Sequence, residues 1–177
     1  MAIAWIIAFL IMAIFFATSV KNGKIILSNN KALSSLSFDD LYNSFTLEVD
    51  KIEDISIKLL DEVLKIEKSN DDKVYIELYG SWDMKNEPVF SYKNNILLIE
   101  QKNTTSFYHK LLVLKLPENA ISKNTNLNVD MKSGSIELSQ FDLNKLSLSN
   151  VSGSTKVLES KFNVADVCYY FTMSLFL

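Results

Sequence analysis

The sequence has no arginine, one cysteine and one histidine, and these absences exclude several classes of protein. Nucleic-acid-binding proteins usually carry a basic surplus and use guanidinium groups to contact phosphates and guanine edges. This chain of 177 residues instead has 18 lysines against 21 acidic residues, a net charge of −3. We therefore expect no nucleic-acid partner.

The single cysteine also excludes an intrachain disulfide and a cysteine zinc cluster. A secreted domain without disulfides must rely on burial and backbone hydrogen bonds, which suits a bacterial envelope domain better than a small animal extracellular module. Cys168 lies in an apolar segment without basic neighbours, which predicts a buried, inert thiol. His109 has no nucleophile motif beside it, which predicts a residue of a surface loop.

Motifs for chemistry are absent from the sequence: it has no phosphate loop, dinucleotide fingerprint or zinc motif. Acidic residues gather near the start of the soluble part, but without the spacing and central glycine of an EF-hand loop, and they predict a solvated face; they are Asp39, Asp40, Glu48, Asp50, Glu53 and Asp54. Asp61-Glu62 and Asp71-Asp72 predict turns. We assign no catalytic residue, no cofactor and no metal site, and we expect a protein that is not an enzyme.

The first 20 residues contain no charge, glycine or proline. As a helix they would span roughly 30 Å, about the thickness of the bilayer hydrocarbon, with apolar side chains on every side. Residues 1–20 therefore predict a transmembrane signal-anchor helix. Ala17-Thr18-Ser19 also offers small residues for a signal peptidase, so a cleaved signal and a secreted domain stay open.

The charges around this segment conflict with an external domain. Lys21 and Lys24 follow the segment and no basic side chain precedes it, which by the positive-inside rule favours a cytoplasmic domain. Two lysines are a small bias. We keep a cell-membrane protein with an extracytoplasmic domain as the first hypothesis and a regulatory protein with a cytoplasmic β domain as the alternative.

Residues 21–51 read as a linker in which Ser37 to Tyr42 predicts a short helical turn. From about Ile52, apolar and polar residues alternate as in half-buried strands, up to Pro117. Lys93-Asn94-Asn95 predicts the turn of a hairpin. The segment from Leu59 to Lys68 is predicted as a strand, with a helix as the alternative.

A repeat follows Asn126, and its period is the distance from Leu127 to Leu146 in the sequence. This offset superposes Ser133-Gly134-Ser135 on Ser152-Gly153-Ser154 and aligns the apolar residues around them: Leu127 with Leu146, Val129 with Leu148, and Leu138 with Val157. Equal spacing of strand, glycine bend and strand is typical of the coils of a β-solenoid. Two hairpins of a sandwich that share a Ser-Gly turn remain an alternative. A leucine-rich repeat is rejected because its asparagine falls out of frame.

Five segments carry a resemblance to the bacterial adhesin-like family DUF4097: Leu64–Gly80, Tyr92–Glu100, Leu112–Pro117, Lys132–Ile136 and Val151–Thr155. The last two resemble the repeated Ser-Gly bend of that family. The resemblance implies a parallel β-helix-like fold behind an N-terminal membrane segment, over about residues 52–160, and it carries no catalytic residues. A non-catalytic binding, adhesin-like or structural role is implied, with a protein or surface glycan as partner.

The resemblance ends at Lys161, where residues 161–177 depart into an apolar tail rich in aromatic residues. We expect a domain that is incomplete at its C-terminus, through truncation or a frameshift, with an exposed edge open to self-association. A carbohydrate-active enzyme is a further alternative, with Asp39 and Asp40 as the first carboxylates to test.

Overall fold

The structure, a computed structural model, describes residues 40–82, 84–102, 110–169 and 175–176. They form strands and no helix: β1 Leu41–Glu48, β2 Asp54–Lys68, β3 Lys73–Gly80, β4 Val89–Lys93, β5 Ile96–Glu100, β6 Lys110–Leu116, β7 Asn126–Ser139, β8 Asp142–Leu158, β9 Lys161–Tyr169 and β10 Leu175–Phe176. Within those ranges no helix has the length and apolar character to cross a bilayer. The membrane helix predicted at residues 1–20 lies outside them.

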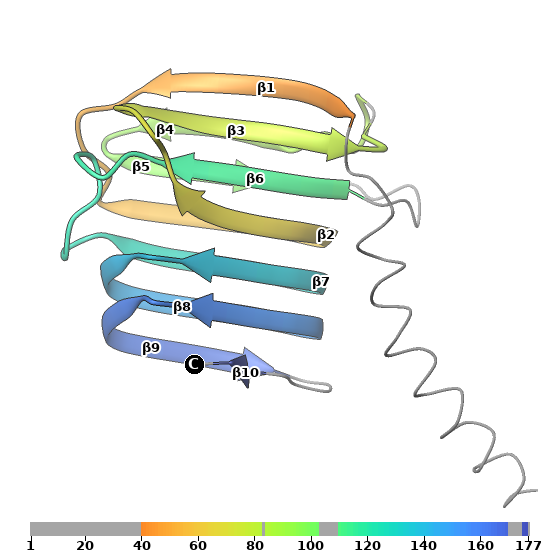
Figure 1. Cartoon of the computed structure of the whole chain (residues 1–177). Helices are drawn as coiled ribbons and strands as arrows, with labels where there is room; N and C mark the ends of the chain where they lie inside the picture. The colour runs from red at the N-terminus through yellow and green to blue at the C-terminus, as the bar shows by residue number, and fades with distance from the viewer. Residues whose placement is uncertain (1–39, 83, 103–109, 170–174, 177) are drawn as a thin grey trace, which may run out of the picture. The chain divides into compact units, whose positions relative to one another are not determined.

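Three long strands lie one above the other at the centre of the fold (Figure 1). β2 pairs with β7, and β7 with β8, in parallel register along most of their length. The first half of β2 also pairs with β5, and its second half pairs with β6. Each long strand therefore bends in its middle. Its first half belongs to one layer of the mixed sheet, which includes β5, and its second half belongs to the other layer, which includes β6.

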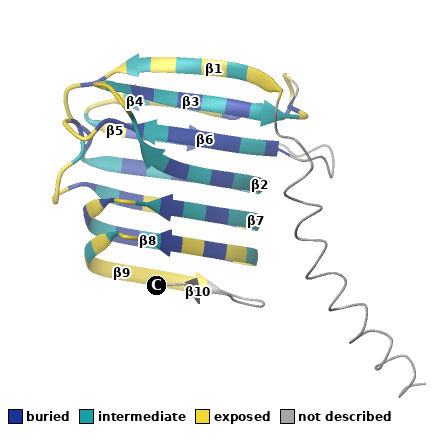
Figure 2. Ribbon diagram, in the orientation of Figure 1, coloured by how far each residue is buried: buried dark blue, intermediate teal, exposed yellow. Residues whose placement is uncertain are grey.

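The core lies between these two layers, and the burial pattern shows where the strands bend. In β2 the buried apolar residues are Ile55, Ile57 and Leu59 before the bend, and Leu64 and Ile66 after it. The alternation thus changes phase between residues 59 and 64, because the strand must keep its apolar side inward on both layers. β7 repeats this pattern, and Figure 2 shows the alternating burial along β7 and β8.

The repeat predicted from the sequence is confirmed by the pairing of β7 with β8. Gly134 is the register partner of Gly153, and the flanking serines pair with serines at the same offset. At both glycines φ is positive, +109° and +143°. A Cβ on Gly134 would lie 2.0 Å from the backbone oxygen of Glu62, and a Cβ on Gly153 would lie 1.7 Å from that of Gly134. Glu62, Gly134 and Gly153 therefore form a column across β2, β7 and β8 in which backbone packs directly on backbone. We call this column the glycine bend.

The first half of the domain adds antiparallel pairs that were not predicted. β3 pairs with both β1 and β6 in antiparallel register, so the sheet is mixed and not uniformly parallel. The hairpin of β4 and β5 is confirmed. Its two turn residues, Asn94 and Asn95, both have positive φ, as the primed turns of two-residue hairpins require. The helical alternative for residues 59–68 is wrong, because those residues lie in β2.

The short helix predicted within residues 37–42 is also wrong where the structure describes it, since Leu41 and Tyr42 begin β1. A single helical turn gains few hydrogen bonds for the backbone order it needs, whereas an edge strand gains a ladder of hydrogen bonds with β3. The folded domain therefore begins within the predicted linker of residues 21–51.

The predicted apolar tail begins with another strand of the stack. β9 pairs in parallel with β8 from Asp142–Lys161 to Asn150–Tyr169, which is again the offset of the repeat. The backbone repeat therefore continues past residue 160. Ala165 and Val167 lie in register with Leu146 and Leu148 of the core. The sequence pattern missed this strand because the segment carries no third Ser-Gly-Ser triplet.

The prediction of a buried Cys168 is wrong, since its side chain is exposed. Most of β9 is exposed, and among the described residues β9 pairs with β8 alone. No described strand covers its other side. A side chain in a strand is buried only where other elements pack against it. The apolar sequence of this segment does not specify whether such elements are present.

Besides the glycine bend, a tight turn joins β7 to β8 and recurs with the same offset between β8 and β9. Gln140 and Glu159 occupy it with φ of 66° and 48°, the left-handed region that side chains other than glycine adopt at a cost. We expect Gln140→Gly to raise the free energy of unfolding by about 0.5–1 kcal/mol, since relief of the left-handed backbone outweighs the entropy that glycine adds to the unfolded chain.

The check on Gln140→Gly is urea unfolding followed by circular dichroism, with Gln140→Ala as the control. Alanine removes the same side chain but keeps the left-handed strain. A gain in the alanine variant equal to that in the glycine variant would assign the effect to the lost amide group and not to the backbone.

Candidate functional site

The acidic residues near the start of the domain do not converge on one site. Asp39 lies outside the described residues, as does His109. The others that have partners sit in separate pairs: Glu48 with Lys73 at 2.8 Å, Glu53 with Lys51 at 2.7 Å, and Asp54 with the amide of Asn126 at 2.8 Å. Within the described ranges, no group of three or more potential metal-ligating side chains comes together.

Asp61 and Glu62, predicted as turn residues, instead lie within β2 at its bend, and Glu62 is fully buried. Its Oε2 accepts hydrogen bonds from the backbone N–H of Leu60 at 3.0 Å and of Asp61 at 2.8 Å. The carboxylate thus provides an acceptor for two backbone donors at the bend, where Leu60 has no register partner in β7. Glu62 therefore holds the bend at the position that Gly134 and Gly153 occupy in the next strands.

Lys110, at the start of β6, is the counter-ion of the carboxylates of Asp61 and Glu62 at this bend. Its ammonium is fully buried, 3.5 Å from Oε1 of Glu62 and 3.7 Å from Oδ1 of Asp61. It also lies 5.4 Å from the ring centroid of Trp82, a cation–π contact. We call Asp61, Glu62 and Lys110 the buried charge cluster.

The amide of Gln101 completes this cluster. Its Oε1 accepts the backbone N–H of Leu60 at 3.1 Å, and its Nε2 donates to the backbone oxygen of Asn86 at 3.0 Å. Burial raises the pKa of Glu62, and the adjacent Asp61 raises it further. The cluster ties β2, the β3–β4 connection, the end of β5 and the start of β6 together. The burial of Glu62 and Lys110 fits a structural role.

A ladder of amide side chains runs across the strands on the outside of the sheet. Asn126 donates to Asp54 at 2.8 Å, Asn144 donates to Asn126 at 2.9 Å, and Asn163 donates to Asn144 at 3.3 Å. Such ladders pair each strand with the one above it. Sequence reasoning missed this ladder, because its asparagines lie about one repeat apart among many others of the same type.

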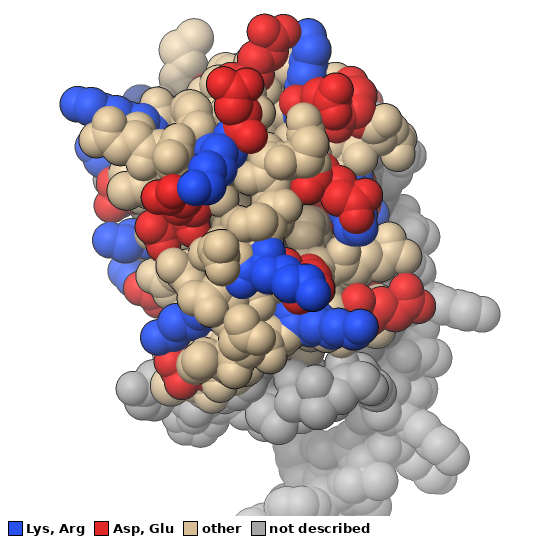
Figure 3. All heavy atoms as spheres, turned by 90° about the vertical axis from the view of Figure 1, so that its left-hand side faces the viewer, with Lys and Arg blue, Asp and Glu red and all other residues tan. Residues whose placement is uncertain are grey.

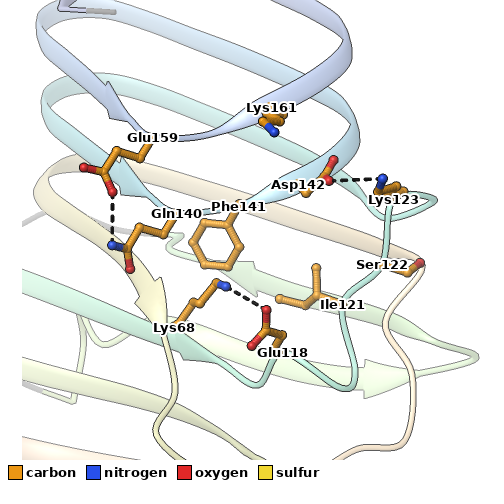
Figure 4. A pocket seen from close by; sticks show the side chains of 10 residues that line it. All are labelled: Lys68, Glu118, Ile121, Ser122, Lys123, Gln140, Phe141, Asp142, Glu159 and Lys161. Atoms are coloured by element: carbon orange, nitrogen blue, oxygen red, sulfur yellow. Dashed lines mark hydrogen bonds and ion pairs between the residues drawn. The ribbon is translucent and has the colours of Figure 1, made fainter.

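A cavity of about 300 Å³ opens among the turns that join the long strands (Figure 4). Its walls come from the end of β2, the β6–β7 connection and the two turns that enter and leave β8. Phe141 and Ile121 supply the apolar part, and charged and polar side chains surround them: Lys68, Glu118, Ser122, Lys123, Gln140, Asp142, Glu159 and Lys161.

Only some of the charged residues that line the cavity form ion pairs. Lys68 pairs with Glu118 at 2.9 Å, and Lys123 pairs with Asp142 at 3.6 Å. Glu159 accepts a hydrogen bond from the neutral amide of Gln140 at 3.2 Å. Among the described residues, Lys161 takes part in none of the ion pairs. The cavity thus presents one negative and one positive group without a charged partner.

Sequence reasoning missed the cavity because its walls come from four separate segments. A signal did exist: the offset of the repeat places Gln140 beside Glu159 and Asp142 beside Lys161. A second hollow, of about 440 Å³, is lined by polar and acidic residues alone: Ser69, Asn70, Asp71, Asp72, Glu118 and Asn119. On the face in Figure 3, lysines and acidic residues of the described chain are interspersed. The cavity beside Phe141 and Ile121 offers apolar surface as well as charge, and we take it as the candidate binding site of the domain.

The fold resembles solved structures, while no family model and no curated protein matches the sequence. One neighbour is a putative cell adhesion protein from Clostridium sporogenes, with a TM-score of 0.52 and 16% identity, over 69% of this chain and 63% of that one. Another is a putative adhesin from Parabacteroides distasonis, with a TM-score of 0.42 and 15% identity, over 77% and 65%. The chain thus spans less than two thirds of each neighbour.

The first of these two structures supports a comparison of folds. The domain is mainly β, with stacked bent strands in a mixed sheet. Its fold is similar to that of a bacterial protein described by its role in adhesion. At 16% identity this similarity concerns the fold alone.

Proposed function

We propose that this chain is a cell-envelope β-solenoid protein of the bacterial adhesin-like family DUF4097, with a non-catalytic binding role. In this proposal residues 1–20 anchor it in the cell membrane and the domain is extracytoplasmic. The observation that carries the proposal is the stacking of Gly134 on Glu62 and of Gly153 on Gly134, since a backbone column at a fixed repeat is typical of solenoid coils. The likeness to an adhesion protein agrees with it.

The partner in this proposal is a protein or a surface glycan. Polar residues alternate with buried apolar ones on both sides of the bend in β7, and the cavity among the turns adds a concave site. The exposed β9 offers a third possibility for contact, because a strand edge without a neighbour accepts a strand from another molecule. Self-association through β9 is therefore part of the proposal.

Protease accessibility tests the placement of the domain. We expect protease added to bacterial protoplasts that express the full chain with a C-terminal epitope to remove the epitope while a cytoplasmic marker stays intact. The membrane pellet should hold the untreated protein if residues 1–20 are an anchor, and the medium should hold it if they are a cleaved signal. An epitope that survives until the protoplasts are lysed would contradict an extracytoplasmic domain.

That last outcome would support the alternative function, a regulatory membrane protein with a cytoplasmic β domain. Lys21 and Lys24 after the apolar segment are the observation that favours it. Replacing both lysines with glutamine is the matched variant. If the lysines set the orientation, that variant becomes accessible to external protease where the unchanged chain is not.

A further inference from the structure

We propose that the cavity among the turns binds a small zwitterion, with its ammonium group at Glu159, its carboxylate at Lys161 and its apolar body over Phe141 and Ile121. The inference deepens the binding role proposed above by naming a ligand class, and it rests on that role. It starts from the charge distribution within the cavity. Two charged side chains there have no charged partner among the described residues, and they have opposite signs.

The two groups cannot neutralise each other in this structure. All ion pairs within 4.0 Å among the described residues have other partners, so the ammonium of Lys161 and the carboxylate of Glu159 lie farther apart than that. In the view of Figure 4, Glu159 lies to the upper left of the Phe141 ring and Lys161 to its upper right. A ligand that carries both charges can bridge them, whereas a ligand with one charge would leave the other unmatched.

The backbone fixes these positions. The N–H of Lys161 donates to the oxygen of Phe141 at 2.7 Å, and the N–H of Gln140 donates to the oxygen of Leu158 at 3.0 Å. The N–H of Phe141 donates to Oγ of Ser160 at 3.1 Å. These hydrogen bonds connect the β7–β8 turn to the β8–β9 turn. Because the backbone is already held in place, a ligand would need to order little of it on binding.

Glu159 is also held by its neighbour in the stack. The amide of Gln140 donates to Oε2 of Glu159 at 3.2 Å, which leaves Oε1 for a ligand. Asp142, the register partner of Lys161, faces Lys123 instead. Lys161 therefore has donors for a carboxylate, and charge-assisted hydrogen bonds of this kind are among the stronger polar contacts.

The size of the cavity sets the size of the ligand. About 300 Å³ is at the lower end of the range for small-molecule sites. It suits a free amino acid with an apolar side chain or a dipeptide, which share the same chemistry of two charged ends around an apolar body. The separation of the charged ends differs between the two, so L-leucine and L-leucyl-L-alanine are the probes that distinguish them.

The test is calorimetric titration of the full chain in nanodiscs. We expect one of the two probes to bind, and blocking its amino group by acetylation or its carboxyl group as an amide to weaken binding about tenfold, the loss expected for one charge-assisted hydrogen bond. Glu159→Gln should weaken the unblocked probe by a similar factor without changing binding of the acetylated probe. Lys161→Gln should likewise weaken binding of the unblocked probe and leave binding of the amidated probe unchanged.

Lys132→Gln, at an exposed position of the glycine bend away from the cavity, is the charge-matched control and should leave binding unchanged. Absence of binding by both probes, or equal binding of blocked and unblocked probes, would overturn the proposal. Equal effects of Lys132→Gln and Lys161→Gln would overturn it as well. Protease accessibility of the domain is independent of these variants, so a failed titration and a failed envelope placement are distinguishable.

Discussion

Replacing Gly134 with alanine is expected to lower the free energy of unfolding by about 4 kcal/mol or more, enough to leave much of the protein unfolded. The added Cβ would lie 2.0 Å from the backbone oxygen of Glu62 and 2.9 Å from its carbonyl carbon. Neither atom can move away without breaking the pairing of β2 with β7. The φ of +109° adds backbone strain for any residue with a Cβ.

Gly153→Ala tests the same column one strand further on, where the added Cβ would meet the oxygen of Gly134 at 1.7 Å. We expect a loss of similar size if β8 unfolds together with the rest of the domain. Urea unfolding followed by circular dichroism measures both variants. A smaller loss for Gly153→Ala with a lower m-value would indicate that β8 and β9 open separately from the first strands.

Ser152→Ala is the matched control for these glycine variants. Ser152 is exposed and adjacent to Gly153, so its loss should change the free energy of unfolding by no more than about 0.5 kcal/mol. Ser133→Ala should also be mild, because its hydroxyl lies 3.4 Å from the oxygen of Leu60, a long hydrogen bond. Tolerance of alanine at Gly134 within about 1 kcal/mol would contradict the stacking of backbone on backbone.

The glycine bend could be predicted from the sequence because it depends on local geometry that repeats. A bend that packs backbone on backbone excludes a Cβ, so glycine recurs at Gly134 and Gly153 with the spacing of the coil. The change of phase between Leu59 and Leu64 marks the same bend in β2. Its residue there is Glu62 and not glycine, since β2 is the first strand of the column and no described backbone of an earlier coil lies against it.

Features that depend on distant segments could not be predicted. Lys110 and Glu62 lie far apart in the sequence, and Asp61-Glu62 reads as a turn until the fold brings the Glu62 carboxylate next to Lys110. β1 resembled part of a linker because its strand is stabilised by pairing with β3, a partner that comes only after β2 in the chain. Cys168 was misassigned for a related reason: burial depends on which strands surround β9, and apolar sequence does not specify them.

The second large effect is expected at the buried charge cluster. Lys110→Met keeps the length of the side chain but removes the counter-ion of Glu62 and Asp61, and we expect a loss of about 3–5 kcal/mol at pH 8. Adding Glu62→Gln to this variant should recover part of the loss. Glutamine retains an oxygen for the N–H groups of Leu60 and Asp61 but carries no charge. Urea unfolding measures both variants.

Lys115→Met on the same strand is the control. Lys115 pairs with Glu77 at 2.8 Å, but both side chains are partly exposed to water. The expected loss there is about 1 kcal/mol or less, since solvent screens the pair and solvates the remaining carboxylate. Equal losses for Lys110→Met and Lys115→Met would mean that burial adds nothing to the cost of an unpaired charge at Glu62.

The pH dependence of these variants separates charge from packing. Because burial raises the pKa of Glu62 above 4.5, the folded protein holds this proton more tightly than the unfolded chain does. The stability from this group is fully present below pH 4.5 and is lost as the pH rises through the folded pKa. Without Lys110 the folded pKa rises further, so Lys110→Met should cost less at pH 5 than at pH 8. The variant that also carries Glu62→Gln should lose this difference. A cost of Lys110→Met that is the same at both pH values would assign the role of Lys110 to packing against Trp82 and not to its charge.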